Sequence, residues 1–156
     1  MKKIFTLLLV CILIFSLTAC KKTGNVGNDA EEKLYIGYVS LDGNTLKLDE
    51  FEFLTQENPD RLEELGISVN DMPNGYYIYN EYEEITSLTI DQNTEFTFFD
   101  TGNLFVSEED DKRYTTKDIE KFRTFLYGDD DIPAIMPFWV KVQGDKVISV
   151  EEQFVV

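Results

Sequence analysis

The chain has 156 residues and a formal charge of −16, with 30 acidic side chains against 14 basic ones and no histidine. The acidic balance argues against a nucleic-acid partner, because phosphate binding depends on clustered Lys and Arg. The lack of histidine excludes Ser-His-Asp and Cys-His catalysis as well as histidine-ligated zinc and haem. Aromatic residues make up 13% of the sequence, which favours a packed globule over a disordered acidic chain.

The first segment of the chain has the pattern of an export signal. Lys2 and Lys3 precede an uncharged apolar run over 4–17, and small residues then stand directly before Cys20. A positive start, an apolar centre and a small-residue exit are typical of a secretory signal. A membrane-spanning helix needs roughly 20 apolar residues, so this run lies at the lower limit for an uncleaved anchor.

The end of this segment carries a family resemblance. The tetrapeptide Leu17-Thr18-Ala19-Cys20 resembles the lipobox of bacterial lipoproteins, in which an aliphatic residue, a small residue and Ala or Gly precede Cys. The resemblance implies that residues 1–19 are a cleaved signal peptide and that diacylglycerol is attached to Cys20. It also implies anchoring at the extracytoplasmic face of the cell membrane. An uncleaved helix or an ordinary signal peptide is the alternative.

The rest of the chain divides into a tether and one domain. Residues 20–33 are polar and rich in Gly and Asn, which predicts a flexible, lipid-anchored tether. Residues 34–156 have the length of a single globular domain. Because Cys11 lies in the signal and Cys20 is the expected lipid site, we expect no disulfide in this domain.

Alternating apolar residues and turn signals predict short strands along most of the domain. They lie at 34–41, 45–48, 76–80, 85–90, 94–99, 104–106, 138–142 and 147–156. The Asp42-Gly43 and Gly144-Asp145 turns predict hairpins, and we expect most links to be of this type. In the last strand, Ile148, Val150 and Phe154 are expected to share one face.

Two helices are predicted. Asn58, Pro59 and Gly66 mark the start and end of a short helix. A longer helix is predicted to begin with a capping box formed by Thr115 and Asp118 and to end at Gly128. Its apolar stripe consists of Ile119, Phe122, Phe125 and Leu126. The sum predicts an α+β fold with a mainly antiparallel β-sheet, curled into a small partly open barrel, and two helices.

The body of the chain carries a second resemblance. The aromatic segment 74–80, together with Phe138-Trp139-Val140 and Glu151-Glu152-Gln153, resembles uncharacterised lipoproteins of Gram-positive, clostridia-like bacteria. These motifs are structural in character. The group carries no activity to transfer.

Two acidic runs are candidates for metal binding. Residues 108–111 and the run Asp129-Asp130-Asp131 offer carboxylate oxygens of the kind that Ca²⁺ prefers. Neither run has the alternating spacing of a calcium-binding EF-hand loop. We therefore interpret both as solvated loops, with Asp129, Asp130 and Asp131 kept as weak metal candidates.

Tyr77, Tyr79 and Trp139 form the candidate ligand surface. Tyr77 and Tyr79 share one strand face, and tyrosine combines a flat contact area with a hydroxyl at low entropy cost. The alternative is an ordinary half-buried sheet position. Trp139 has the opposite parity from Phe138 and Val140, so we place it on the second face of the sheet, covered by the helix over 119–126.

No set of residues in the sequence specifies a catalytic site, which favours a non-enzymatic binding or accessory module. We expect it to reach the membrane through its lipid anchor and to bind an unidentified envelope ligand or protein, with no cofactor besides the diacylglycerol on Cys20. One alternative is a calcium-responsive domain. Another is a carboxylate-dependent hydrolase of envelope glycans, for which nothing in the sequence selects two particular carboxylates.

Overall fold

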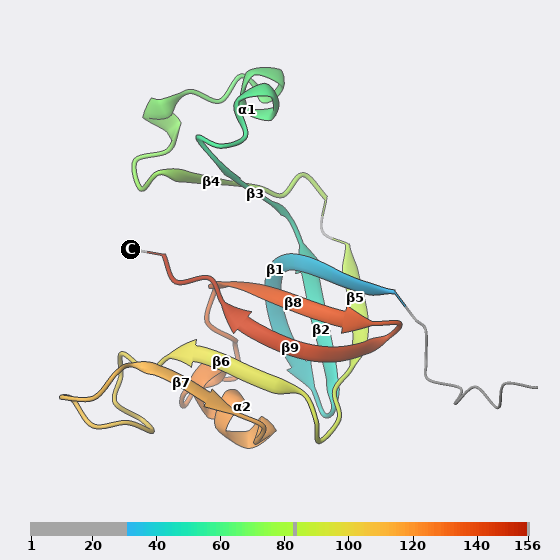
Figure 1. Cartoon of the computed structure of the whole chain (residues 1–156), viewed down its shortest axis with the longest axis vertical. Coiled ribbons are helices and arrows are strands. Elements are labelled where there is room, and N and C mark those ends of the chain that lie inside the picture. The colour runs from blue at the N-terminus through green and yellow to red at the C-terminus, as the bar shows by residue number, and fades with distance from the viewer. Residues whose placement is uncertain (1–30, 83, 156) are drawn as a thin grey trace, which may run out of the picture.

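Seven strands form one sheet in the order β5-β2-β1-β8-β9-β6-β7, and two more form a small separate sheet (Figure 1). The computed structural model describes residues 31–82 and 84–155. The strands of the main sheet are β1 (Glu32–Asp42), β2 (Thr45–Glu50), β5 (Ile85–Thr89), β6 (Glu95–Phe99), β7 (Arg113–Thr116), β8 (Pro137–Gln143) and β9 (Lys146–Glu152). Neighbouring strands are antiparallel except where β9 meets β6 and β5.

The main sheet curls back on itself. A single parallel pairing of Thr89 in β5 with Lys146 in β9 brings β5, at one edge of the sheet, back to β9. The sheet is therefore partly ring-like without forming a closed barrel. The predicted α+β class, with a mainly antiparallel sheet and two α-helices in the described chain, is confirmed.

The predicted hairpins at the two ends of the domain are confirmed as β1–β2 and β8–β9. The link between β5 and β6 is an exception. The register pairs β5 with β2, whereas β6 pairs with β9 and β7. The turn at 91–94 therefore carries the chain from one part of the ring to another instead of closing a hairpin.

The predicted phase of the last strand is wrong. The pairing passes from Lys141–Ser149 to Val142–Val147, so Ile148 is left without a partner in the ladder. An extra residue of this kind inverts the side-chain alternation around it. Val147 and Val150 are consequently both buried, and Ile148 is 39% exposed.

Helix α2 (Ile119–Tyr127) covers the inner face of the sheet, and its predicted apolar stripe is confirmed. Phe122 stacks on Phe96 with ring centroids 4.5 Å apart, and Phe125 stacks on Phe98 at 4.0 Å. Gly128 caps the end of the helix. These rings pack with the buried β-strand residues into the main core.

The predicted capping box is wrong in one residue. Asp118 caps α2 by accepting a hydrogen bond from the backbone N–H of Glu120 at 3.0 Å. Thr115 instead lies in β7, where its hydroxyl is 3.0 Å from that of Thr97 on β6. Cross-strand pairing thus determines the position of Thr115.

The strand predicted over 104–106 is absent from the structure. The buried carboxylate of Asp100 accepts hydrogen bonds from the backbone N–H groups of Leu104, Phe105 and Val106 at 2.8, 2.7 and 2.9 Å. Because one side chain takes up three consecutive donors, the segment wraps around Asp100 and does not join a strand ladder.

The remaining elements form an arm that projects from the main sheet (Figure 1). They are β3 (Glu52–Thr55), the predicted short helix α1 (Pro59–Leu65), the 3₁₀ turn η1 (Val69–Asp71) and β4 (Tyr76–Tyr79). The arm has its own small core, made by Leu54, Leu62 and Met72. Along the chain the arm lies between β2 and β5, which places it at one end of the main sheet (Figure 1).

Candidate functional site

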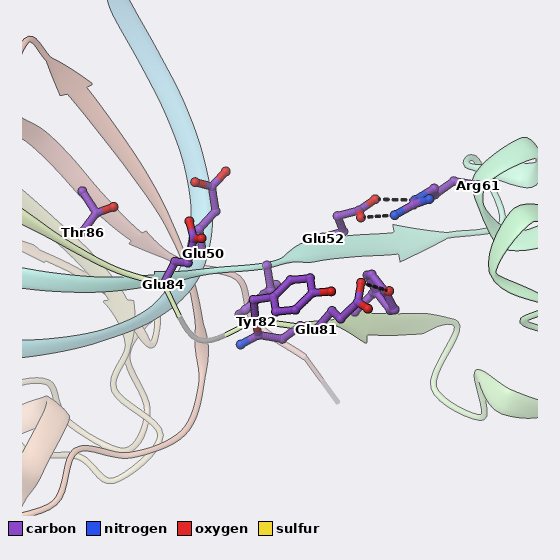
Figure 2. Close-up of a pocket in the computed structure, with 10 residues that line it drawn as sticks. Glu50, Glu52, Arg61, Glu81, Tyr82, Glu84 and Thr86 are labelled. Atoms are coloured by element: carbon purple, nitrogen blue, oxygen red, sulfur yellow. Dashed lines mark hydrogen bonds and ion pairs between the residues drawn. The ribbon is translucent and has the colours of Figure 1, made fainter.

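A cleft of about 400 Å³ lies where the arm joins the main sheet (Figure 2). Residues from β2, β3, α1, β4 and β5, and from the segments that join β2 to β3 and β4 to β5, line it. They are Glu50, Phe51, Glu52, Arg61, Tyr79, Asn80, Glu81, Tyr82, Glu84 and Thr86. Ligand pockets in proteins span about 300–1,000 Å³, so this cleft is large enough for a small ligand or a few side chains.

The single basic residue of the cleft is already paired within the arm. The guanidinium of Arg61 donates two hydrogen bonds to the carboxylate of Glu52, from Nε at 2.9 Å and from Nη2 at 2.6 Å. Its Nη1 lies 2.8 Å from Glu64, and the guanidinium carbon lies 5.4 Å from the ring centroid of Tyr79. The hydrogen bond from Arg61 is the main reason that the pKa of Glu52 lies below its ordinary value.

A second carboxylate of the arm is held by tyrosines instead of a cation. The hydroxyl of Tyr79 donates to Glu81 at 2.6 Å. Hydrogen bonds from Tyr79 and then from Tyr82 hold the pKa of Glu81 below its ordinary value. The same contact raises the pKa of Tyr79. The charge of Arg61 also lowers the pKa of Glu81, but less than these hydrogen bonds do, and no Lys or Arg of the described residues forms an ion pair with Glu81.

The sheet side of the cleft adds two more carboxylates. Glu50 ends β2 and Glu84 precedes β5, and both are exposed (Figure 2). In the described part of the chain, no Lys or Arg forms an ion pair with either of them. Four carboxylates thus line the cleft against one guanidinium, beside the aromatic rings of Phe51, Tyr79 and Tyr82.

The structure separates the three residues of the predicted ligand surface. Tyr77 and Tyr79 both pack against the small core of the arm, and of the two only Tyr79 lines the cleft. The half-buried Trp139 lies on β8 of the main sheet and does not line the cleft; its indole N–H donates to Gln153 at 2.8 Å. The expected covering of Trp139 by the helix is wrong, because Phe122 of α2 packs on Phe138, on the opposite face of β8.

Both acidic runs are exposed loops. Asp130 and Asp131 border a separate pocket of about 410 Å³ that also contains Arg123 and Tyr127. Over the ranges 31–82 and 84–155, no three or more His, Cys, Asp or Glu side chains are grouped as metal ligands would be. The weak metal candidates Asp129, Asp130 and Asp131 stay predictions.

The predicted lipid site Cys20 and the tether up to residue 30 lie outside the described residues. None of the helices in the described ranges has the length and apolar character that crossing a membrane requires. No protein-family model, curated protein or solved structure matches the chain.

Sequence reasoning did not find the cleft. Its ten lining residues are spread over positions 50–86 and follow no motif with a fixed spacing. The one local signal is the pairing of Arg61 with Glu64 on α1, which is common on helix surfaces. The glutamates come together only because the chain leaves the main sheet after β2, forms the arm from β3 to β4, and returns to the main sheet at β5.

Proposed function

We propose that this chain is an exported, lipid-anchored and non-enzymatic binding protein whose cleft holds a positively charged group of its ligand. The observation that carries the proposal is the charge of the cleft. Four carboxylates and one guanidinium line the cleft, and this guanidinium already pairs with Glu52, one of the four, and with Glu64 outside the cleft. A cationic group entering beside Glu50 and Glu84 would compensate two charges that form no ion pair within the described chain, with Glu81 nearby in the same cleft.

The aromatic lining supports the same ligand class. A Lys or Arg side chain over an exposed tyrosine ring gains about 0.5–1 kcal/mol from the cation–π interaction. Tyr82 is 70% exposed, which leaves its ring accessible to a ligand. Charge attraction would also accelerate the encounter at low ionic strength, because clefts of one sign concentrate ligands of the opposite sign.

The state of the carboxylates makes binding a better proposal than glycoside hydrolysis. Hydrolysis needs a carboxyl group with a raised pKa to act as general acid. In the cleft, the pKa values of Glu52 and Glu81 are both lowered by hydrogen bonds. These two groups are therefore ionised at neutral pH and have no proton to donate there.

The anchor proposal rests on the lipobox tetrapeptide that ends at Cys20. A tether of this length spans roughly 20 Å, and the acidic domain is repelled by an anionic membrane surface. The cleft would then stand clear of the bilayer. Labelling with a radioactive or clickable fatty acid tests the anchor: we expect label in the full chain and none in Cys20→Ala. Equal labelling of both proteins would contradict it.

Calorimetric titration with a short peptide that alternates lysine and threonine tests the cleft. We expect the double variant Glu50→Gln/Glu84→Gln to bind about tenfold more weakly than the unsubstituted protein, which corresponds to about 1.4 kcal/mol. The matched control is Glu108→Gln/Glu109→Gln, which removes the same charge from an exposed loop away from the cleft. If both double variants weaken binding equally, the peptide responds only to net charge and the cleft proposal fails.

A further inference from the structure

The outer edge of β5 is open beside the cleft. One edge of β5 pairs with β2 along its whole length. On the other edge, the only pairing in the described part of the chain is that of Thr89 with Lys146 of β9. Among the described residues, no strand pairs with residues 85–88 on this edge.

The direction of the backbone groups on β5 follows from one hydrogen bond. The N–H of Thr89 donates to the carbonyl oxygen of Asp145 at 2.8 Å, so the peptide groups of Thr89 point away from β2. In an antiparallel ladder these groups alternate between the two edges from residue to residue. The N–H and C=O groups of Ile85 and Ser87 therefore point to the open edge, and those of Thr86 and Leu88 point to β2.

The open edge is accessible to solvent. Ile85 is 51% exposed, and Thr86 and Ser87 are exposed as well. Proteins usually protect such edges with Pro, Lys or a covering segment, because an unpaired row of donors and acceptors recruits another strand. The sequence of β5 is Ile-Thr-Ser-Leu-Thr and contains neither Pro nor Lys.

The cleft lies at the start of this edge. Glu84 directly precedes β5 and Thr86 belongs to it, and both line the cleft. A strand added to a sheet lies about 4.8 Å from its neighbour, with alternate side chains on each face. Side chains on the cleft face of such a strand would be within reach of Glu84, Thr86 and, one strand further, Glu50.

We propose that an extended, Lys- or Arg-containing segment of a partner protein binds as an additional strand on the open edge of β5. Its backbone hydrogen-bonds with Ile85 and Ser87, and its basic side chains enter the cleft. Main-chain pairing supplies affinity in this binding mode, and the side-chain pockets supply specificity. The inference rests on the proposed function, because it names the class of ligand that the acidic cleft receives.

The test compares two ligands and two variants of the full chain. The first ligand is the alternating lysine–threonine peptide, and the second is the same peptide with every second backbone nitrogen methylated. Methylation leaves the charge unchanged but removes the donors that a strand needs. We expect the methylated peptide to bind about tenfold more weakly.

Ser87→Pro is the matching change in the protein. It removes the N–H that points to the open edge and leaves the donors facing β2 in place. Ser87→Ala is its control, because the Ser87 hydroxyl accepts a hydrogen bond from Lys47 at 2.9 Å and both variants lose it. We expect Ser87→Pro to weaken binding of the unmethylated peptide about tenfold and Ser87→Ala to leave it near the original value.

The outcomes separate this inference from the proposed function. If methylation and Ser87→Pro have no effect while Glu50→Gln/Glu84→Gln still weakens binding, the cleft stands and strand addition is wrong. If the cleft variants have no effect either, the proposed function fails. If Ser87→Pro does not fold, the methylated peptide decides the question with the unchanged protein. Concentration-dependent self-association that Ser87→Pro abolishes would assign the edge to a second copy and overturn the proposal.

Discussion

The hydroxyl of Tyr127, on α2, forms two hydrogen bonds with the backbone of Leu41 at the end of β1. It accepts from the Leu41 N–H at 2.8 Å and donates to the Leu41 carbonyl oxygen at 3.3 Å. The two residues are 86 positions apart in the sequence. This contact joins the end of the helix to β1. It also satisfies backbone groups of Leu41 on the edge of β1 that faces away from β2, where the pairing with β8 ends at Tyr38.

The first prediction concerns this contact. Tyr127→Phe leaves a partly buried N–H and C=O without their partner, so we expect a loss of about 1–3 kcal/mol in the free energy of unfolding. The measurement is urea unfolding followed by circular dichroism. Tyr35→Phe is the control, since Tyr35 packs against the same core and no hydrogen bond of its hydroxyl is found within the described residues. Equal losses in both variants would contradict a role for the hydroxyl.

The second prediction concerns the approach of β1 to β2. A Cβ atom at Gly37 would lie 2.3 Å from the backbone oxygen of Asp49 and 2.7 Å from a methyl carbon of Leu48. Because backbone atoms cannot move aside cheaply, we expect Gly37→Ala to cost about 1–3 kcal/mol or to prevent folding. Gly102→Ala is the control: its nearest neighbour would be Leu104 at 3.8 Å, an ordinary contact. Similar melting temperatures for the two variants would refute the steric argument.

The third prediction concerns acid stability. Burial by itself would raise the pKa of Asp100, but hydrogen bonds from the backbone of Phe105, Leu104 and Val106 outweigh it and lower this pKa. The unfolded carboxyl titrates near its ordinary value of about 3.9. The stabilisation is therefore complete above that value and is lost as the pH falls through the lower pKa of the folded state.

Asp100→Asn tests this linkage. The amide cannot accept all three backbone hydrogen bonds, so we expect the variant to be less stable at neutral pH and to lose less stability on acidification below about pH 4. Asp110→Asn, in an exposed loop, serves as the matched control and should keep the original pH dependence. If the free energy of unfolding of Asp100→Asn changes with pH in parallel with that of the original chain, the prediction is wrong.

The fourth prediction concerns the guanidinium in the cleft. Arg61→Met removes the one positive charge of the cleft and leaves Glu52 unpaired. We expect the lysine–threonine peptide to bind more tightly and with a steeper dependence on salt, because the net negative charge of the cleft increases. The arm should lose only about 0–1 kcal/mol, since the ion pairs of Arg61 are partly exposed.

Titration at low and physiological ionic strength measures this effect. Glu64→Gln is the control, because it removes a partner of Arg61 that does not line the cleft. We expect this variant to bind the peptide slightly more weakly than the original chain. Weaker binding by Arg61→Met would mean that Arg61 itself holds the ligand in place and that the cationic ligand class is wrong.

Several local elements were predictable because short-range chemistry specifies them. Helix α1 follows from Pro59 at its start and Gly66 at its end, and Gly66 adopts the left-handed conformation that such an end requires. Asp42-Gly43 closes the β1–β2 hairpin in the expected place. The apolar stripe on α2 faces the core because its 3.6-residue period leaves only one face free of charge.

Other elements depended on contacts between distant residues. The segment 104–106 has strand-forming residues, but the buried Asp100 takes its backbone donors. Thr115 is of a residue type that is common at helix N-caps, but pairing with Thr97 holds it in a strand. The extra residue at Ile148 arises from the register of β9 against β8. The sequence of one strand alone does not show this register.

By itself, the sequence specified the α+β class, both helices, the end hairpins and the acidic character of the surface. These features follow from periodicity, turn residues and composition, all of which are local or additive. Only the tertiary structure brought Glu50, Glu52, Glu81 and Glu84 to one cleft and left the edge of β5 open. The cleft depends on where the chain leaves the main sheet to form the arm. The open edge depends on the single pairing of Thr89 with Lys146, where β5 meets β9. Such geometry is decided by long-range strand pairing.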